Sequence, residues 1–401
     1  MILLGSFLHH DELADILGRA LEDRLIPGDA PRLKTIVNLS SYIGRVYSTW
    51  FAENLLHHIR GHAVQSRSVR TKGELKDLIV SNPYHTSPRI DELIARYRKF
   101  PEDYYRETPY EGRVFTAGEP ARYVGSRRIK RIRRIAEKCA RRIVDYIVDQ
   151  IRRRADELAI ERALRLGIAK DQLITPPEEM VAEFQHAERR ILKSIRDGLF
   201  VAAMPQFYID DVVGIRVLVD PESGQKFEEW IGQASDLTIV DEKHFSGDFS
   251  GRNMVVAWRL PTDRLLLSPP DARASETLVR RAVAPDPAAL HKLYEEFVRS
   301  ASGHVRFEIL TIDYEQVLEA EIGRSQHEDH VRAQRDRKEY TGRLAQNVEA
   351  LMVYLFSFAQ SSLADLDELP IKLRGSYLDD YLAGLLRELY APGYQTGGLT
   401  F

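Results

Sequence analysis

The stretch YIDDVVGIRVLVD, residues 208–220, constrains the fold most strongly, because its apolar and β-branched residues occupy both parities. That pattern predicts a strand buried on both faces. Side chains alternate along a strand, so Asp211 is expected on one face and Asp210, Gly214 and Arg216 on the other. A glycine leaves space for another group to approach closely, and an arginine supplies a permanent cation. The stretch therefore predicts a functional site as well as a strand.

Composition sets broad limits on the kind of protein. The 401 residues are enough for two or three domains, and 57 Lys and Arg against 60 Asp and Glu give no overall charge that would favour nucleic acid or a membrane. The single cysteine, Cys139, excludes an intrachain disulfide framework and fits a reducing compartment. The N-terminus lacks a basic signal region, and the apolar segment 350–360 is too short to span a bilayer. We expect a cytoplasmic protein without a membrane partner.

The pattern along the chain predicts an α+β fold in four parts. Residues 1–120 show helical periodicity in pieces, and residues 121–175 indicate a basic amphipathic helix. Strands and helices alternate over residues 176–335, which predicts a core with a mixed β-sheet. Residues 336–401 return to helical periodicity. The expected architecture is a mixed-sheet core with helical N- and C-terminal extensions.

The predicted basic helix has two alternative explanations. Residues 121–154 hold 13 Lys and Arg against three acidic residues. Apolar residues recur at helical spacing beside a basic stripe that contains Arg127, Arg131, Arg134 and Lys138. The arginines either pair with acidic neighbours on a solvated helix, or face the phosphates of a nucleotide or of an RNA such as tRNA.

A second carboxylate belongs to another predicted strand. Glu308, in HVRFEILTID, is the only carboxylate inside that strand, and a charge there requires a partner or an ion. Together with Asp211 it could hold Mg²⁺ against nucleotide phosphates, if the two lie on adjacent strands. The alternative is a structural ion pair between Glu308 and Arg306 or Arg216.

Several of these motifs, in this order, resemble the synthetase domain of the RelA/SpoT family, the pyrophosphokinases that make the alarmone (p)ppGpp. The resemblance covers about residues 180–335. Asp211, Gly214 and Arg216 match the family's Asp-x-x-Gly-Ile-Arg strand, and Glu308 matches the glutamate that begins a later strand. A following helix motif is matched by Ala320, Glu321, Gly323 and His327, and the family's upstream Ser-Ile pair by Ser194 and Ile195.

The chain also departs from the family's pattern. Glu188 stands where the family has an arginine, and Gly251-Arg252 stands where the family has a glycine followed by a tyrosine that stacks on the acceptor guanine. Leu310 and Ile312 replace a glutamine and an arginine after the strand glutamate. These departures argue against ordinary (p)ppGpp synthesis and leave the two carboxylates in place.

The resemblance implies a nucleotidyltransferase-like core with ATP and Mg²⁺ as cofactors. The expected activity is Mg²⁺-dependent transfer of pyrophosphate from ATP to the hydroxyl of a nucleotide or of an RNA end. Asp211 and Glu308 would be the catalytic metal ligands. The resemblance assigns nucleotide binding to six further residues: Arg190, Ser194, Arg216, Lys243, Arg252 and His327. The alternative is a catalytically lapsed copy of the fold that binds a nucleotide or a protein and regulates another process.

Overall fold

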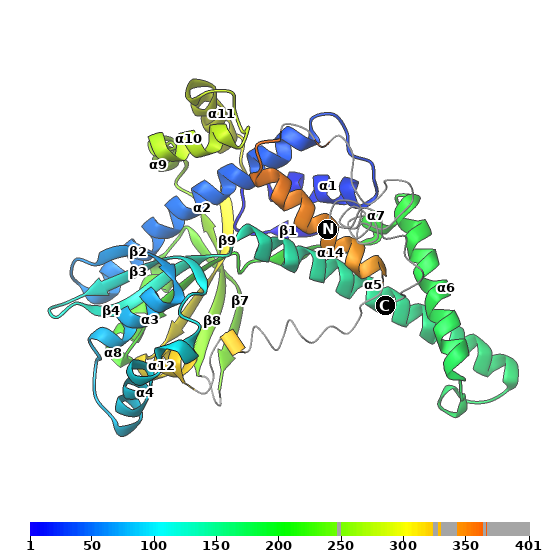
Figure 1. Ribbon diagram of the computed structural model, residues 1–401, viewed down its shortest axis with the longest axis horizontal. Coiled ribbons are helices and arrows are strands. Elements are labelled where there is room, and N and C mark those ends of the chain that lie inside the picture. Colours follow the sequence, from blue (N-terminus) through cyan, green and yellow to red (C-terminus); the bar gives the residue numbers. More distant parts are fainter. Residues whose placement is uncertain (247–249, 324–327, 330–342, 364–365, 367–401) are drawn as a thin grey trace, which may run out of the picture.

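The computed structural model shows an α+β fold built on a mixed sheet (Figure 1), which confirms the predicted fold class. Long helices extend from one side of the sheet and form a separate helical layer. The structure describes residues 1–246, 250–323, 328–329, 343–363 and 366.

A seven-stranded sheet forms the centre of the molecule. Its strands, in order across the sheet, are β2 (Gln65–Thr71), β3 (Pro109–Ala117), β4 (Arg122–Ile129), β6 (Val213–Leu218), β9 (His304–Ile312), β8 (Gly251–Arg259) and β7 (Leu237–Phe245). Neighbouring strands run antiparallel, except that β6 and β9 are parallel. A parallel pair requires a long crossover, which here consists of α8 (Pro221–Gln233), the β7–β8 hairpin and three further helices: α9 (Thr262–Leu266), α10 (Ala272–Arg280) and α11 (Pro287–Arg299).

One face of the sheet is covered over its central strands. Helices α2 (Asp29–Arg60) and α8 (Pro221–Gln233) pack on it, and its side chains alternate with those of the opposite face as the pleat requires. Phe307 of β9 is fully buried there, and its ring centroid lies 4.8 Å from that of Phe51 on α2 in an edge-to-face arrangement. Asp220 caps α8, because its side chain accepts a hydrogen bond from the Ser223 amide.

The other face is covered over only part of its area. Helices α3 (Lys72–Ser81), α4 (Pro88–Lys99) and α12 (Tyr314–Ile322) pack against the ends of β6 and β9 and form a second apolar core. Toward β8 and β7 the same face stays partly exposed, including Asn253, Val255 and Glu308. The edge strand β7 is exposed along almost its whole length. This uncovered half of the sheet, on the side of Glu308, is called the open face below.

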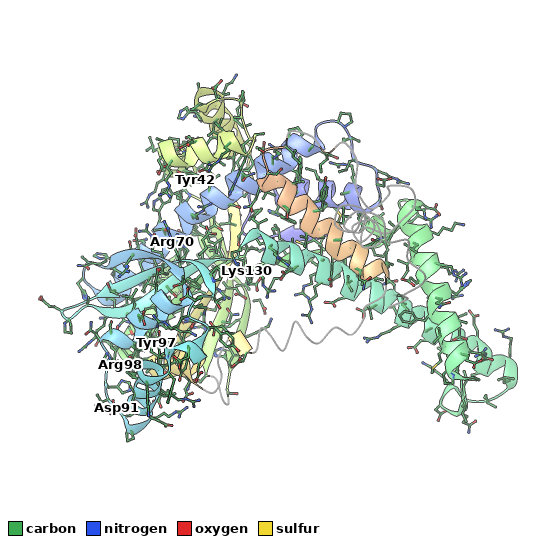
Figure 2. The ribbon with its side chains drawn as sticks, viewed as in Figure 1. Tyr42, Arg70, Asp91, Tyr97, Arg98 and Lys130 are labelled. Carbon is green, nitrogen blue, oxygen red and sulfur yellow. The ribbon has the colours of Figure 1, made fainter. Side chains whose placement is uncertain are left out.

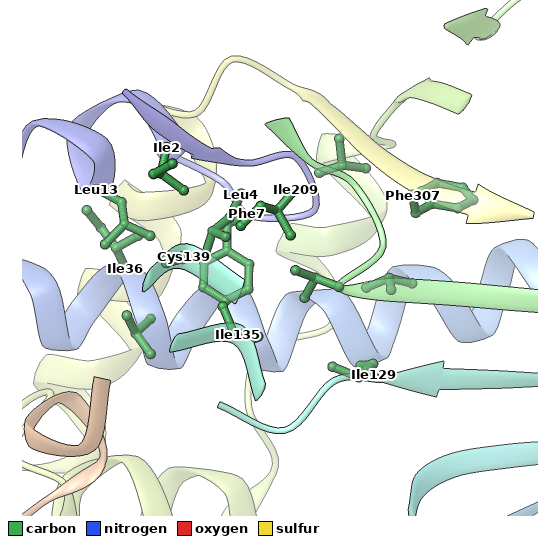
Figure 3. Packing of buried hydrophobic residues seen from close by; sticks show 14 of the residues in the cluster. Ile2, Leu4, Phe7, Leu13, Ile36, Ile129, Ile135, Cys139, Ile209 and Phe307 are labelled. Atoms are coloured by element: carbon green, nitrogen blue, oxygen red, sulfur yellow. The ribbon is translucent and has the colours of Figure 1, made fainter. Parts of the chain in front are cut away.

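The helical layer continues the apolar core of the covered face, because its buried residues belong to the same cluster as Phe307. In Figure 3, Leu4 and Ile209 lie beside Phe7, Ile135 and Cys139. Two long helices dominate the layer, α5 (Ile132–Leu166) and α14 (Arg343–Gln360), and α14 packs on both α5 and α2. The apolar segment 350–360 lies inside α14 and is largely buried, as its hydropathy predicted. A third long helix, α6 (Pro177–Arg196), packs on α5, and the shorter elements of the layer are β1 (Ile2–Leu4), α1 (His10–Leu21), α7 (Phe200–Ala203) and β5 (Phe207–Ile209).

The N-terminal and basic regions differ from the sequence prediction. Residues 1–120 contribute β2 and β3 to the main sheet, and residues 122–129 form β4, whereas a helix was predicted there. The basic helix begins only at Ile132, so Ile129 and Arg127 belong to a strand. The spacing of apolar and basic residues here fits a short strand as well as a helix. Arg127 is buried in the strand under α2, and it donates to Thr49 Oγ1 of that helix over 2.9 Å.

The strand predicted over residues 206–219 is split in two. β5 pairs in parallel with β1 in a separate two-stranded sheet, and β6 belongs to the main sheet. A turn at residues 211–212 separates them. The expected alternation therefore does not continue through the two aspartates, because a turn resets which way successive side chains point.

We predict that Phe307→Ala lowers the free energy of unfolding by about 3–5 kcal/mol, because the buried ring leaves a cavity among packed aromatic side chains. Denaturant unfolding followed by circular dichroism measures the loss. His304→Ala, an exposed position on the same strand, is the control and is expected to change stability by less than about 0.5 kcal/mol. Equal effects of the two substitutions would contradict the packing described here.

Candidate functional site

The parallel pairing of β6 and β9 sets where the two sequence-predicted carboxylates lie. Glu308, in the middle of β9, lies directly opposite Gly214, and Asp211 precedes Gly214 by three residues. The strands β6 and β9 are adjacent, but Asp211 itself lies in the turn before β6 and not on a strand. Both segments border the open face, where a ligand has access.

Asp211 is held by two lysines that the sequence analysis did not assign to the site. Lys130, at the junction of β4 and α5 (Figure 2), lies with its Nζ 2.6 Å from Asp211 Oδ2. Lys138 of α5 donates to the same oxygen. Burial alone would raise the pKa of Asp211, but the two ammonium groups hold it well below the usual range. Burial in turn lowers the pKa of Lys130 to about 7.

Asp210 is the least compensated carboxylate of the site. Its Oδ1 is buried and has no hydrogen-bond partner among the described residues. Burial raises its pKa to about 6; the nearby charge of Arg306 opposes this rise, and those of Asp211 and Glu308 add to it. The three carboxylates therefore influence one another electrostatically. A buried, unpartnered carboxylate oxygen is a position where a cation or a ligand donor would be stabilised.

Two glycines allow the close packing around these carboxylates. Gly5, directly after β1, leaves no room for a side chain, since a Cβ there would lie 2.2 Å from Asp210 Oδ1 and 2.8 Å from Arg306 Cβ. At Gly214 the approaching group is Arg128, whose Nε would lie 3.4 Å from an added Cβ. The close approach predicted at Gly214 is thus made by a basic side chain of β4.

Glu308 makes only a weak hydrogen bond with the described part of the protein. Asn253 of the neighbouring strand donates to Glu308 Oε1 over 3.3 Å. The predicted alternative, an ion pair with Arg216 or Arg306, is not formed among the described residues. Arg216 pairs with Glu321 instead. The Arg306 guanidinium lies over the ring of Tyr208, with 3.8 Å between Cζ and the ring centroid. Glu308 is consequently available to a ligand.

The remaining predicted binding residues are spread over the molecule. Lys243 of β7 shares the open face with Glu308, as the register across β8 shows, and pairs with Asp241 over 3.0 Å. Arg252 lies on the opposite, covered face, where it pairs with Glu228 and Glu242. Arg252 and Glu308 therefore do not share a face of the sheet, because successive residues of a strand point to opposite faces.

Two other predicted residues stand on α6. Arg190 and Ser194 belong to this helix, which packs on α5 at the far end from the sheet (Figure 1). The structure does not bring them to Asp211 and Glu308, because the long α5 carries the following chain away before α7 and β5 return it. His327 lies outside the described residues.

The predicted basic stripe does not form a single surface. Arg127 is buried on the covered side of the sheet, Arg131 is exposed before α5 begins, and Arg134 pairs with Glu137 one turn along the helix. This arrangement does not support an RNA surface led by these arginines. Lys138 does reach the site, through Asp211.

The residues present fit a cation that arrives with a ligand better than a preformed metal centre. Among the described residues, no group of three or more His, Cys, Asp and Glu side chains is placed to hold a metal ion. Mg²⁺, however, is usually bound by one or two carboxylates together with substrate phosphates. The unpartnered Asp210 Oδ1, Glu308 and Asp211 supply such oxygens, once phosphate takes over the two lysines that now neutralise Asp211.

Comparison with known proteins adds no relative: no family model, no curated protein and no solved structure matches this chain. Within the described residues, every helix is too short or too polar to cross a lipid bilayer.

We predict that Asp210→Asn stabilises the protein at pH 7 and not at pH 4, in the presence of a chelator. The pKa of Asp210 is raised from 3.8 to about 6 in the folded state. The folded chain therefore binds the carboxyl proton of Asp210 more tightly than the unfolded chain does, and folding stability is lost as the pH rises from about 4 to 6. Asparagine cannot ionise. We expect a gain of about 1–2 kcal/mol at pH 7, allowing for partial solvent exposure.

Urea unfolding at the two pH values measures this difference. Asp197→Asn, at an exposed position after α6, is the matched control and is expected to leave stability unchanged at both. Destabilisation of Asp210→Asn at pH 7 would show that the carboxylate is satisfied in the folded state.

Proposed function

We propose that this chain transfers pyrophosphate from ATP, in a Mg²⁺-dependent reaction, to the hydroxyl of a nucleotide or of an RNA end. One observation carries the proposal: in the parallel β6–β9 pair Gly214 lies opposite Glu308, and Asp211 stands three residues before Gly214 in the turn that leads into β6. Carboxylates carried by neighbouring chain segments of this kind are what a phosphate-transfer site uses to hold Mg²⁺. The RelA/SpoT resemblance of the same residues supports this assignment.

Each side chain of the site has a distinct part in the proposed reaction. Mg²⁺, when bound with ATP, supplies charge stabilisation at the phosphates. Glu308 and Asp211, with Asp210 Oδ1 beside them, are the oxygens that would hold it. Lys130 and Lys138 pair with Asp211 in the free protein and are close enough to bind the phosphates when ATP arrives. Lys243, on the same face, lies in position to contact a longer phosphate chain.

The open face offers a surface for the acceptor. Val255 lies next to Glu308 in the register, and Asn253 and Ala257 flank it on the same face. None of the three is aromatic, so an acceptor base receives no stacking partner from this part of β8. We therefore expect acceptor selection to depend on polar contacts with phosphate and sugar more than on stacking against guanine.

A second candidate function is regulation by a catalytically lapsed domain. It is favoured by the pairing of Asp211 with two lysines, which neutralises the carboxylate without a metal ion. In this case the open face binds a nucleotide, and no group is transferred. The two candidate functions differ in whether nucleotide binding requires Mg²⁺ and in whether a phosphate group is transferred from ATP to an acceptor.

Incubation of the full chain with γ-labelled ATP, Mg²⁺ and separate pools of GTP, GDP, ATP and tRNA tests the proposal. We expect label to appear on at least one acceptor. Asp211→Asn and Glu308→Gln are each expected to reduce transfer about 100-fold or more, because each removes charge stabilisation from the transition state.

Glu242→Gln is the matched control, since Glu242 lies in the same sheet on the covered face, and it is expected to leave transfer unchanged. Binding of ATP measured by calorimetry with and without Mg²⁺ separates the two candidates. Binding of ATP that does not require Mg²⁺, without transfer of label to any acceptor, would favour the regulatory function over the enzymatic one. Absence of binding under both conditions would refute both.

A further inference from the structure

A buried cluster of charges lies on the covered part of the same sheet face, away from Glu308. It joins Lys72 and Lys76 of α3, Arg216 of β6, Glu321 of α12 and Glu328, and it is called the α3 charge cluster. Lys76 and Glu321 are fully buried, and the side chain of Glu328 is 9% exposed. Burying five charges is costly unless each is compensated.

The two carboxylates of the cluster are held very differently. Glu321 accepts hydrogen bonds from Lys72 Nζ over 2.9 Å and from Arg216 Nη1 over 2.8 Å, one on each oxygen. Glu328 lies 3.0 Å from Lys72 Nζ and 3.5 Å from Lys76 Nζ, yet neither of its buried oxygens accepts a hydrogen bond of acceptable geometry from the residues that the structure describes. Glu321 is therefore an integral partner, whereas Glu328 contributes charge without well-directed bonds.

The charge balance of the cluster also distinguishes Glu328 from Glu321. Lys72, Lys76 and Arg216 supply three positive charges, and Glu321 supplies one negative charge. Without Glu328, two positive charges remain uncompensated in a buried position. Burial lowers the pKa of Lys76, in agreement with an ammonium group that its present partners compensate incompletely.

We propose that Lys72, Lys76 and Arg216 form a binding site for a phosphate-bearing ligand, and that Glu328 occupies this site in the free protein. A phosphate dianion matches the two uncompensated charges, and its three terminal oxygens can accept hydrogen bonds from both lysines in place of the Glu328 carboxylate. Glu321 keeps Arg216 and Lys72 oriented. The ligand and Glu328 compete for one position.

The position of Arg216 relates this site to the open face. Arg216 follows Gly214 by two residues on the same strand and the same face, which is about 7 Å along β6. The site thus adds a second phosphate-binding position beyond the carboxylates of the proposed reaction. Its existence does not depend on catalysis, and it is tested without ATP or Mg²⁺.

Binding of inorganic pyrophosphate to the full chain, measured by calorimetry with a chelator present, tests this site. We expect Glu328→Gln to bind pyrophosphate about tenfold more tightly than the unmodified chain, because the competing carboxylate no longer reduces the fraction of open sites. The matched control is Asp329→Asn, which removes the neighbouring carboxylate that accepts a hydrogen bond from Tyr105. Its affinity is expected to equal that of the unmodified chain.

A double variant tests whether the gain in pyrophosphate affinity depends on Lys76. Lys76→Met combined with Glu328→Gln removes one charge of each sign, and it is expected to fold and to lose the tenfold gain. If Glu328→Gln does not fold, Glu328→Asp, which withdraws the carboxylate by one methylene group, is expected to give a smaller gain in the same direction. Equal affinity of the Glu328 and Asp329 variants, or a gain that survives Lys76→Met, would overturn the proposal. Loss of label transfer alone would not affect it.

Discussion

The parallel pairing of β6 with β9 is the constraint on which the site depends. Every other neighbouring pair in the main sheet is antiparallel, so within this sheet only β6 and β9, among the described neighbours, run in the same direction. Glu308 lies in the middle of β9, directly opposite Gly214, and Asp211 lies in the turn three residues before Gly214. The register of this pair therefore sets the position of Glu308 relative to the turn that holds Asp211.

Charge compensation then determines how each carboxylate of the sheet is used. Asp211 and Glu321 are each bound by two cations, and the pKa of each lies well below its usual range even though burial acts in the opposite direction. Asp210 has no such pair, so burial dominates and its pKa rises. Glu308 keeps only an amide donor. Glu321 therefore organises the scaffold, whereas Asp211 becomes available only when a ligand takes over its two lysines. Asp210 and Glu308 are the incompletely paired carboxylates among the described residues.

The sequence predicted the parts of the fold that local patterns encode. The apolar run before Asp220, the strand around Glu308 and the apolar helix near residue 355 all form as expected, because their burial follows from periodicity alone. β4 was missed, since the contact that holds the buried Arg127 comes from Thr49 on α2, a distant segment that local spacing does not reveal. The face on which Arg252 lies was not predicted for a related reason: it is determined by register with β9, a contact between distant segments.

The contribution of the N-terminus shows why the rest of the site escaped prediction. β1 pairs with β5 more than 200 residues later, and the backbone then passes beside Asp210 and accepts a hydrogen bond from the Arg306 amide at Gly5 O over 2.7 Å. Three segments distant in sequence thereby enclose the carboxylate that lacks a partner. The sequence around Gly5 does not predict this close packing, because the requirement for glycine comes from the side chains of Asp210 and Arg306 in other segments. The electrostatic character of the site is therefore a property of the tertiary packing, imposed on residues whose identities alone leave it undetermined.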